Sequence, residues 1–233
     1  MRQPIWTSDE VLLAVNTYFE IGDYRKISPD NPLVIELSQT LRDLPLHGHI
    51  NETFRNLSGT EMTLKSIAKL DTNAKYSMKA FTNLQREIYN YYQNRQLFLR
   101  RLCYTMKACL PLPFEYRRDV SSPSNMTGNI LYQNHLYIEQ KSKTAKLVKA
   151  NARGRLKSIC QVCEKDLSQI YGENGPELLE QHYAEDITNY SKLMNVLQSR
   201  FINICPICHK LAHINPEMYL YNNLKQHVRQ EGV

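Results

Sequence analysis

Two short cysteine motifs carry the clearest chemistry in this sequence. Cys160 and Cys163 form one Cys-x-x-Cys motif, and Cys205 and Cys208 form the other. Each such turn places two thiolates about one tetrahedral edge apart, so two turns together can complete a structural zinc site. The 41 residues between the motifs are too many for an ordinary zinc ribbon, but they suffice for a hairpin that returns the chain to the same metal. Inside a reducing cell this pattern favours a metal site over disulfide bonds.

Three histidines near these cysteines could bind a second cation. His209 directly follows Cys208, and His213 lies four residues later. Histidines at positions i and i+4 share one face of a helix and can bind the same ion. His182, between the two cysteine motifs, is the obvious third ligand, and three histidines would leave a position open for water or phosphate. The alternative is a single structural zinc, held by a subset of these residues in a module without catalysis.

The composition predicts a protein that does not enter a membrane. Of the 233 residues, 42% are apolar, and no apolar run approaches the roughly 18 residues that span a bilayer. The first ten residues, MRQPIWTSDE, lack the apolar stretch of a secretory signal. We therefore expect a soluble, cytoplasmic protein.

Basic residues are concentrated in the middle of the chain. The net charge is +6, and residues 95–158 hold thirteen Lys or Arg against three Asp or Glu. Such a stretch suits the phosphate backbone of a nucleic acid, because each neutralised phosphate releases a counterion. A solvated helix face is the alternative. The side chains expected to contact DNA are Lys141, Lys143, Lys146, Lys149, Arg153, Arg155 and Lys157.

The chain is predicted to divide into a helical N-terminal domain and a C-terminal metal module. Pro111, Pro113 and the Ser- and Gly-containing stretch after them mark the boundary. The predicted segments are 1–110 for the helical domain, 111–131 for a loop-rich linker, 132–157 for a basic helix, 158–215 for the metal module and 216–233 for a C-terminal helix.

Helical periodicity runs through the N-terminal domain. Thr7 and Glu10 have the spacing of a capping box, so the first helix is expected to begin there. Further helices are expected over 34–44 and 59–70, and one long helix over about 78–109. Two cysteines of that long helix, Cys103 and Cys109, are expected in the core. Four histidines without a ligand partner at a meaningful spacing are expected at the surface or in turns: His47, His49, His135 and His227.

The metal module resembles the McrA-like branch of the HNH endonucleases. The resemblance covers about residues 156–215, where CQVCEKDLSQIYGENGPELLEQHY is followed by FINICPICHKLAH. It includes an aromatic-Gly pair, here Tyr171-Gly172, and the position of the family's Glu-x-His-His motif, which reads Glu-Gln-His-Tyr from Glu180 in this sequence. The N-terminal stretches WTSDEVLLAVNTYFEIG, NPLVIELSQTLRDLP and FRNLSGTEMTLKSIAKLD resemble, more weakly, a helical region of restriction-type HNH proteins. The resemblance implies a mainly α fold class, with a helical N-terminal domain and a small zinc-stapled ββα-metal module.

The resemblance also implies roles for individual residues. Structural Zn²⁺ would be held by the two cysteine motifs. One catalytic divalent cation (Mg²⁺, Mn²⁺, Ni²⁺ or Zn²⁺) would be held against the scissile phosphate by His182, His209 and His213.

This sequence departs from the family pattern at two positions. The second His of the His-His pair, which normally acts as general base, is Tyr183 here. Tyr183 would either act as a base or nucleophile with a lowered pKa, or merely pack in an inactive enzyme. The middle position of the motif, nine residues before His209, is Arg200, which would either stabilise the transition state or simply contact the DNA backbone.

These features together predict a metal-dependent DNA endonuclease in restriction or anti-phage defence. Its expected partner is double-stranded phage or other foreign DNA, with defence proteins beside it, and one module would cut one strand unless two copies form a homodimer. The N-terminal domain would choose the target or dock a partner. The alternatives are a catalytically inactive zinc module that binds DNA and an adaptor that keeps the nuclease fold as a scaffold. A zinc-dependent deaminase is disfavoured, because no His-x-Glu motif is present.

Overall fold

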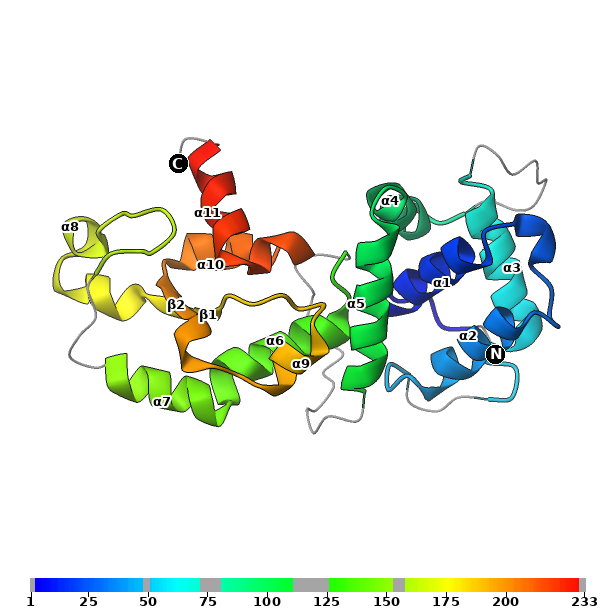
Figure 1. The fold of residues 1–233 in the computed structure, drawn as a ribbon, viewed down its shortest axis with the longest axis horizontal. Coiled ribbons are helices and arrows are strands. Elements are labelled where there is room, and N and C mark those ends of the chain that lie inside the picture. The colour runs from blue at the N-terminus through cyan, green and yellow to red at the C-terminus, as the bar shows by residue number, and fades with distance from the viewer. Residues whose placement is uncertain (1–2, 48–50, 72–80, 111–125, 153–157, 231–233) are drawn as a thin grey trace. The chain divides into compact units, whose positions relative to one another are not determined.

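The protein folds into two compact units. The computed structural model describes residues 3–47, 51–71, 81–110, 126–152 and 158–230. The first unit holds residues 1–119 and 128–130, and the second holds residues 120–127 and 131–233. In the described ranges the chain is mainly helical with one two-stranded sheet, as the predicted fold class requires (Figure 1). Within these ranges, every helix is too short or too polar to cross a membrane.

The first unit is built around one buried helix, α1 (Ser8–Ile21). The predicted capping box is present, because Thr7 Oγ1 accepts the Glu10 N–H and the Glu10 carboxylate accepts the Thr7 N–H. The five residues 11–15 are all buried. The helices in contact with α1 are α2 (Pro32–Asp43), α3 (Leu57–Ala68), α4 (Asn83–Tyr92) and α5 (Gln96–Cys109) (Figure 1). A helix that is apolar and covered on all sides forms the core of its domain.

The prediction of one long helix over 78–109 is wrong for the described part of that range. The chain forms α4 and α5 instead, and it leaves helical geometry between them, where Arg95 has φ −131° and ψ 33°. The break lets both helices pack against α1. The cysteines Cys103 and Cys109 of α5 are buried, as predicted.

The second unit begins with two helices where one basic helix was expected over 132–157. Here α6 (Asn129–Lys141) ends before Ser142, and α7 (Lys143–Ala152) follows it. The Ser142 hydroxyl donates to the Ile138 carbonyl at 2.7 Å and accepts the Ala145 N–H at 3.0 Å. Serine satisfies the free amide groups at a helix start in this way, so Ser142 divides the segment. The remaining residues of the predicted helix, 153–157, lie outside the described ranges, as do 111–125 of the predicted linker.

The core of the metal module is a small antiparallel sheet followed by a helix. Strand β1 (Glu180–Tyr183) pairs with β2 (Phe201–Ile204), with His182 opposite Ile202, and α10 (Pro206–Ala212) follows β2 directly. The remaining elements are η1 (Tyr24–Lys26) in the first unit, and in the second α8 (Leu167–Tyr171), η2 (Gly172–Leu178), α9 (Tyr190–Met194), η3 (Gln198–Arg200), η4 (Pro216–Tyr219) and α11 (Tyr221–Gln230).

Candidate metal centres

The four cysteines of the two motifs meet in one place, here called the cysteine cluster. The sulfur atoms of Cys160, Cys163, Cys205 and Cys208 all lie within 4.8 Å of one another. The Cys163 and Cys205 sulfurs are 3.9 Å apart. Zinc–sulfur bonds of about 2.3 Å in a tetrahedron place two sulfurs roughly 3.8 Å apart. The cysteine cluster therefore has the ligand set and the spacing of a structural zinc site.

Local backbone geometry fixes both cysteine turns. The first turn closes when the Glu164 N–H donates to the Cys160 carbonyl at 2.9 Å, with Glu164 in the left-handed region at φ 62°. In the second turn Cys205 caps α10, because its sulfur accepts the Cys208 N–H at 3.5 Å. The Cys205 N–H also donates to the Cys160 sulfur at 3.3 Å. Hydrogen bonds from Cys208 and from backbone N–H groups lower the pKa of the Cys160 thiol, which favours the thiolate that zinc binds.

The three histidines predicted as ligands also converge. His182 lies on β1, His209 lies on α10, and His213 is the residue that ends α10. The Nε2 atoms of His209 and His213 are 3.0 Å apart. The ring centroids of His182 and His213 are 5.2 Å apart. Strand β1 and helix α10 thus bring three imidazoles to one point.

Helix α6 adds two residues that sequence reasoning missed. His135 and Glu139 lie one helical turn apart, and Glu139 contacts the three histidines. The prediction that His135 lies at the surface or in a turn is wrong, since it is completely buried. The spacing of His135 and Glu139 is the same i and i+4 spacing that singled out His209 and His213, and it was the available signal. These two residues and the three histidines are called the histidine cluster below.

Burial and charge set the electrostatics of the histidine cluster. Burial alone would raise the pKa of Glu139, but the surrounding histidines, His135 first, hold it well below the usual value. Burial lowers the pKa of His135, and it lowers that of His213 to about 3. Burial also opposes protonation of His209, but Glu139 and Glu180 outweigh it and raise that pKa. The cluster therefore combines an ionised carboxylate with two imidazoles, those of His135 and His213, that burial keeps neutral.

Tyr183 and Arg200 lie outside the histidine cluster. Side chains alternate across a strand, so Tyr183 and His182 point to opposite faces of β1. The Tyr183 hydroxyl donates to the Lys192 carbonyl at 3.1 Å, and burial raises the pKa of the phenol rather than lowering it. Arg200 Nε lies 3.2 Å from a Glu185 carboxylate oxygen, and about half of the Arg200 side chain is exposed. The structure thus brings neither the Tyr183 hydroxyl nor the Arg200 guanidinium to the histidines, although the Tyr183 N–H donates to Glu139 at 2.9 Å.

The described basic residues of α7 are exposed. Lys143 and Lys146 both face solvent. The side chains of Lys141 and Lys149, and the residues Arg153, Arg155 and Lys157, lie outside what the structure describes. Two of the histidines expected at the surface or in turns can be placed. His47 lies close to Glu10 in the first unit, with 3.3 Å between Nε2 and Oε2, and His227 lies on α11. His49 lies outside the described ranges.

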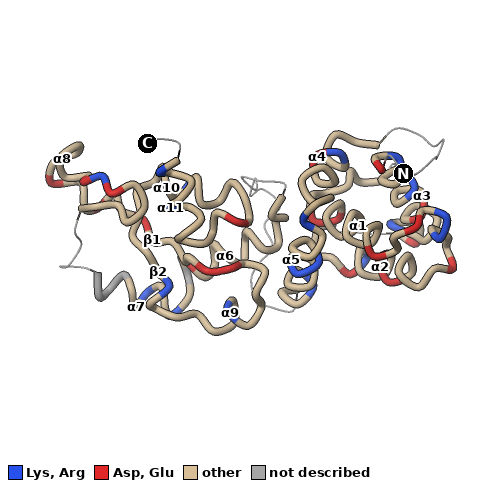
Figure 2. The backbone as a smooth tube through the Cα atoms, turned by 45° about the horizontal axis from the view of Figure 1, so that its top comes forward, with Lys and Arg blue, Asp and Glu red and all other residues tan. Residues whose placement is uncertain are grey.

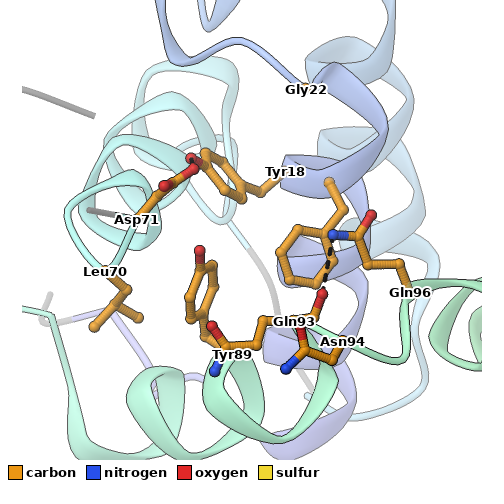
Figure 3. Close-up of a pocket in the computed structure, with 9 residues that line it drawn as sticks. Tyr18, Gly22, Leu70, Asp71, Tyr89, Gln93, Asn94 and Gln96 are labelled. Atoms are coloured by element: carbon orange, nitrogen blue, oxygen red, sulfur yellow. Dashed lines mark hydrogen bonds between the residues drawn. The ribbon is translucent and has the colours of Figure 1, made fainter. Parts of the chain in front are cut away.

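The first unit contains a hollow with a different chemistry. It has a volume of about 440 Å³, and Tyr18, Tyr89 and Gln93 are among its lining residues (Figure 3). The Tyr18 hydroxyl donates to Asp71 at 2.8 Å. The lining contains aromatic rings, amides and one carboxylate, but neither His nor Cys. The candidate metal centres therefore both belong to the second unit.

Comparison with known proteins leaves the site to be interpreted on its own geometry. No protein-family model matches the chain, and neither a curated protein nor a solved structure shows significant similarity to it.

Proposed function

We propose that this chain is a metal-dependent DNA endonuclease of the HNH type, which hydrolyses phosphodiester bonds at the histidine cluster. The observation that carries the proposal is the convergence of His182, His209 and His213 from β1 and α10, beside a separate cysteine cluster. A structural zinc needs a closed set of ligands, and the cysteine cluster provides one. The histidines are then free for a second cation, which is the arrangement that the resemblance to HNH nucleases implies.

The residues around the cluster hold the ligands in a fixed orientation. A divalent cation at this site would lower the pKa of a water molecule and stabilise charge on the phosphate and the leaving group. Glu180 Oε2 lies 2.6 Å from His209 Nδ1, so His209 turns its Nε2 into the cluster. The Tyr219 carbonyl accepts a hydrogen bond from His182 Nε2 at 3.0 Å, so His182 turns its Nδ1 inward. Such outer partners fix the tautomer and the ring orientation of a ligand.

The accessible edge of the cluster is at His209. The side chains of His135, Glu139, His182 and His213 are at most 5% exposed, whereas that of His209 is 16% exposed and that of Glu180 is 49% exposed. A phosphate would therefore approach from the side of α10 and the start of β1. Tyr183 keeps its proposed role in proton chemistry only if its hydroxyl leaves the Lys192 carbonyl when DNA binds. Arg200 is proposed to contact phosphate through its exposed half.

DNA affinity is proposed to come from α7. Within the described residues α7 carries Lys and no acidic residue, as Figure 2 shows by colour, and Lys143 and Lys146 are exposed. Contacts of this kind give affinity without sequence information. Replacing both residues with Gln should reduce the slope of log K against log salt by about 2, since each phosphate contact contributes about 0.9. An unchanged slope would remove α7 from the interface.

The biological setting of the proposal follows from the resemblance alone. The substrate would be double-stranded phage or other foreign DNA, and the protein would act in the cytoplasm beside other defence proteins. One cluster holds one catalytic cation, so one chain would nick one strand. A double-strand break would need a homodimer or two successive events.

A plasmid-nicking assay tests the proposal. The full chain is incubated with supercoiled plasmid across Mg²⁺, Mn²⁺, Ni²⁺ and Zn²⁺, together with His209→Ala and Tyr183→Phe. His227→Ala on α11 is the matched control, because it removes an imidazole of the same unit that lies outside the cluster. We expect nicking by the wild type and the control and none by His209→Ala. Full activity of His209→Ala would remove the mechanism.

A catalytically inactive zinc module that binds DNA is the second candidate. The burial of the cluster and the hydrogen bond of the Tyr183 hydroxyl to Lys192 favour it. Elemental analysis separates the two candidates. The nuclease should bind two cations per chain and nick plasmid, whereas the binding module should hold one zinc, bind DNA and cut nothing.

A further inference from the structure

Glu139 of α6 sits between the three predicted ligands of the histidine cluster. Its Oε1 lies 2.7 Å from His182 Nδ1. Its Oε2 lies 3.2 Å from His209 Nε2 and 3.5 Å from His213 Nε2. Metal–ligand bonds of about 2.1 Å place neighbouring ligand atoms roughly 3.0–3.5 Å apart in tetrahedral or octahedral sites. Glu139 is therefore within 3.5 Å of a nitrogen of each of the three histidines, and its carboxylate, His135, His182 and His213 offer ligand atoms that all lie within 4.8 Å of one another.

The hydrogen bond of His182 leaves the inward nitrogen of that ring without a proton. A carbonyl oxygen only accepts, so His182 Nε2 must carry the proton that it donates to Tyr219. His182 Nδ1 then has a lone pair, and this buried atom makes no hydrogen bond although Glu139 Oε1 is 2.7 Å away. Glu180 likewise accepts from His209 Nδ1, so His209 Nε2 is the ring nitrogen that faces Glu139.

Lone pairs on buried nitrogens directed at a buried carboxylate repel one another. A cation between them turns each repulsion into a coordinate bond. His213 supports this reading, because its Nε2 lies 3.0 Å from His209 Nε2, where two imidazoles face each other in a buried site. A cation at the point where the three nitrogens and Glu139 meet would satisfy all four groups.

His135 and the backbone hold Glu139 in place. Oε1 of Glu139 lies 2.8 Å from His135 Nε2 and accepts the Tyr183 N–H at 2.9 Å. Both donors are buried, and Glu139 is 2% exposed. A ligating carboxylate is held by outer hydrogen bonds of this kind. These two contacts hold Oε1, and Oε2 faces His209 and His213, so the geometry of Glu139 is that of a ligand rather than a base.

We propose that Glu139 is the fourth protein ligand of the cation in the histidine cluster and that His135 is its positioning residue. This assignment deepens the proposed function and rests on it for the use of the cation in hydrolysis. A set of three imidazoles and one carboxylate suits Zn²⁺, Mn²⁺, Fe²⁺ or Ni²⁺, whereas Mg²⁺ prefers oxygen ligands and keeps several waters. The site should therefore take a transition metal in preference to Mg²⁺.

Metal affinity of the full chain tests the assignment without reference to cleavage. The cysteine cluster is first filled with Zn²⁺, and the second site is then titrated with Mn²⁺ or Co²⁺ against a competing chelator. Glu139→Gln keeps the shape of the side chain and removes its charge. We expect it to weaken the second cation by more than about 100-fold, because loss of an outer partner alone costs about 10–100-fold. His135→Leu should weaken binding of the second cation by an amount within that 10–100-fold range. His135→Gln keeps an N–H donor, so it should recover part of the lost affinity.

Glu185→Gln is the matched control. Glu185 is a buried carboxylate of the same unit that pairs with Lys192 and Arg200 rather than with the cluster. It should leave the second affinity unchanged, and the zinc content of the cysteine cluster should be equal in all variants if they fold. If a variant does not fold, its affinity cannot be compared with that of the wild type. The ligands of Co²⁺ in the wild-type protein are then identified by X-ray absorption at the cobalt edge. We expect three imidazoles and a carboxylate there.

The possible outcomes separate this assignment from the proposed function. An unchanged affinity in Glu139→Gln, a Co²⁺ spectrum without a carboxylate, or stronger binding of Mg²⁺ than of Mn²⁺ would overturn the assignment, even if the protein nicks DNA. Glu139-dependent binding without nicking would support the assignment and refute the nuclease. A wild-type chain that binds only one cation would overturn both.

Discussion

Loss of zinc from the cysteine cluster is predicted to unfold the second unit and to leave the first unit folded. A domain of about 100 residues is stable by roughly 5–15 kcal/mol. A structural zinc ion contributes about 10–16 kcal/mol to folding. The fully buried apolar residues around the cysteines are few, so we expect that they do not replace that contribution: Val162, Leu167, Ile204, Ala212, Leu224 and Val228. The second unit without zinc should therefore have little or no net stability.

The first unit should persist because it has its own core around α1. Hydrogen exchange read by mass spectrometry follows each unit separately, and Trp6, the single tryptophan, reports the first unit by fluorescence. The perturbation is Cys205→Ser, which removes one zinc ligand and keeps a side chain that can cap α10. We expect the amides of β1, β2 and α10 to exchange rapidly while those of α1 stay protected.

Cys103→Ser is the matched control, since the Cys103 thiol is buried in the first unit and donates to the Leu12 carbonyl at 3.6 Å, which a hydroxyl can also do. It should keep the zinc content and the protection of the second unit. If β1 and β2 stay protected in zinc-free Cys205→Ser protein, the cysteine cluster does not hold the module together and this reasoning is refuted.

Three further predictions concern charged groups. Burial raises the pKa of Asp9 from 3.8 to about 6, so the folded chain keeps a proton that the unfolded chain loses. The free energy of unfolding of the wild type, measured with urea, should thus fall by roughly 3 kcal/mol as pH rises from about 4 to 6. The Asp9→Asn variant should show no such fall. Arg55→Met should cost about 3–5 kcal/mol, because it leaves Glu10 buried without the 2.7 Å ion pair; a cost below about 1 kcal/mol would contradict that account. Glu180→Gln should weaken binding of the second cation about 10–100-fold, because His209 is then held less firmly. An unchanged affinity would show that the 2.6 Å contact between Glu180 and His209 has no role in binding.

The parts of the fold that local sequence encodes could be predicted. The capping box at Thr7 and Glu10 fixes the start of α1, and two Cys-x-x-Cys motifs determine which sulfurs can meet. The breaks at Arg95 and Ser142 could not be predicted from periodicity, because apolar positions continue on both sides of each break. Tertiary packing on α1 decides the first break, and a side-chain cap decides the second.

The candidate cation site was only partly visible in the sequence. His209 and His213 were found because they follow a cysteine motif at helical spacing. His135 and Glu139 have the same spacing but stand alone in α6, and only the packing of α6 against β1 and α10 brings Glu139 to the other ligands. The sequence likewise did not decide whether the Tyr183 side chain points toward the cluster, because that depends on how β1 pairs with β2.

The most direct test of the account is a crystal of the full chain grown with Mn²⁺ or Zn²⁺ and measured at the absorption edges of both metals. The account predicts two anomalous peaks per chain, one among the sulfurs of the cysteine cluster and one between Glu139, His182, His209 and His213. A single peak at the cysteines, with the histidine cluster closed by protons alone, would contradict the central claim that this module holds a second cation for chemistry.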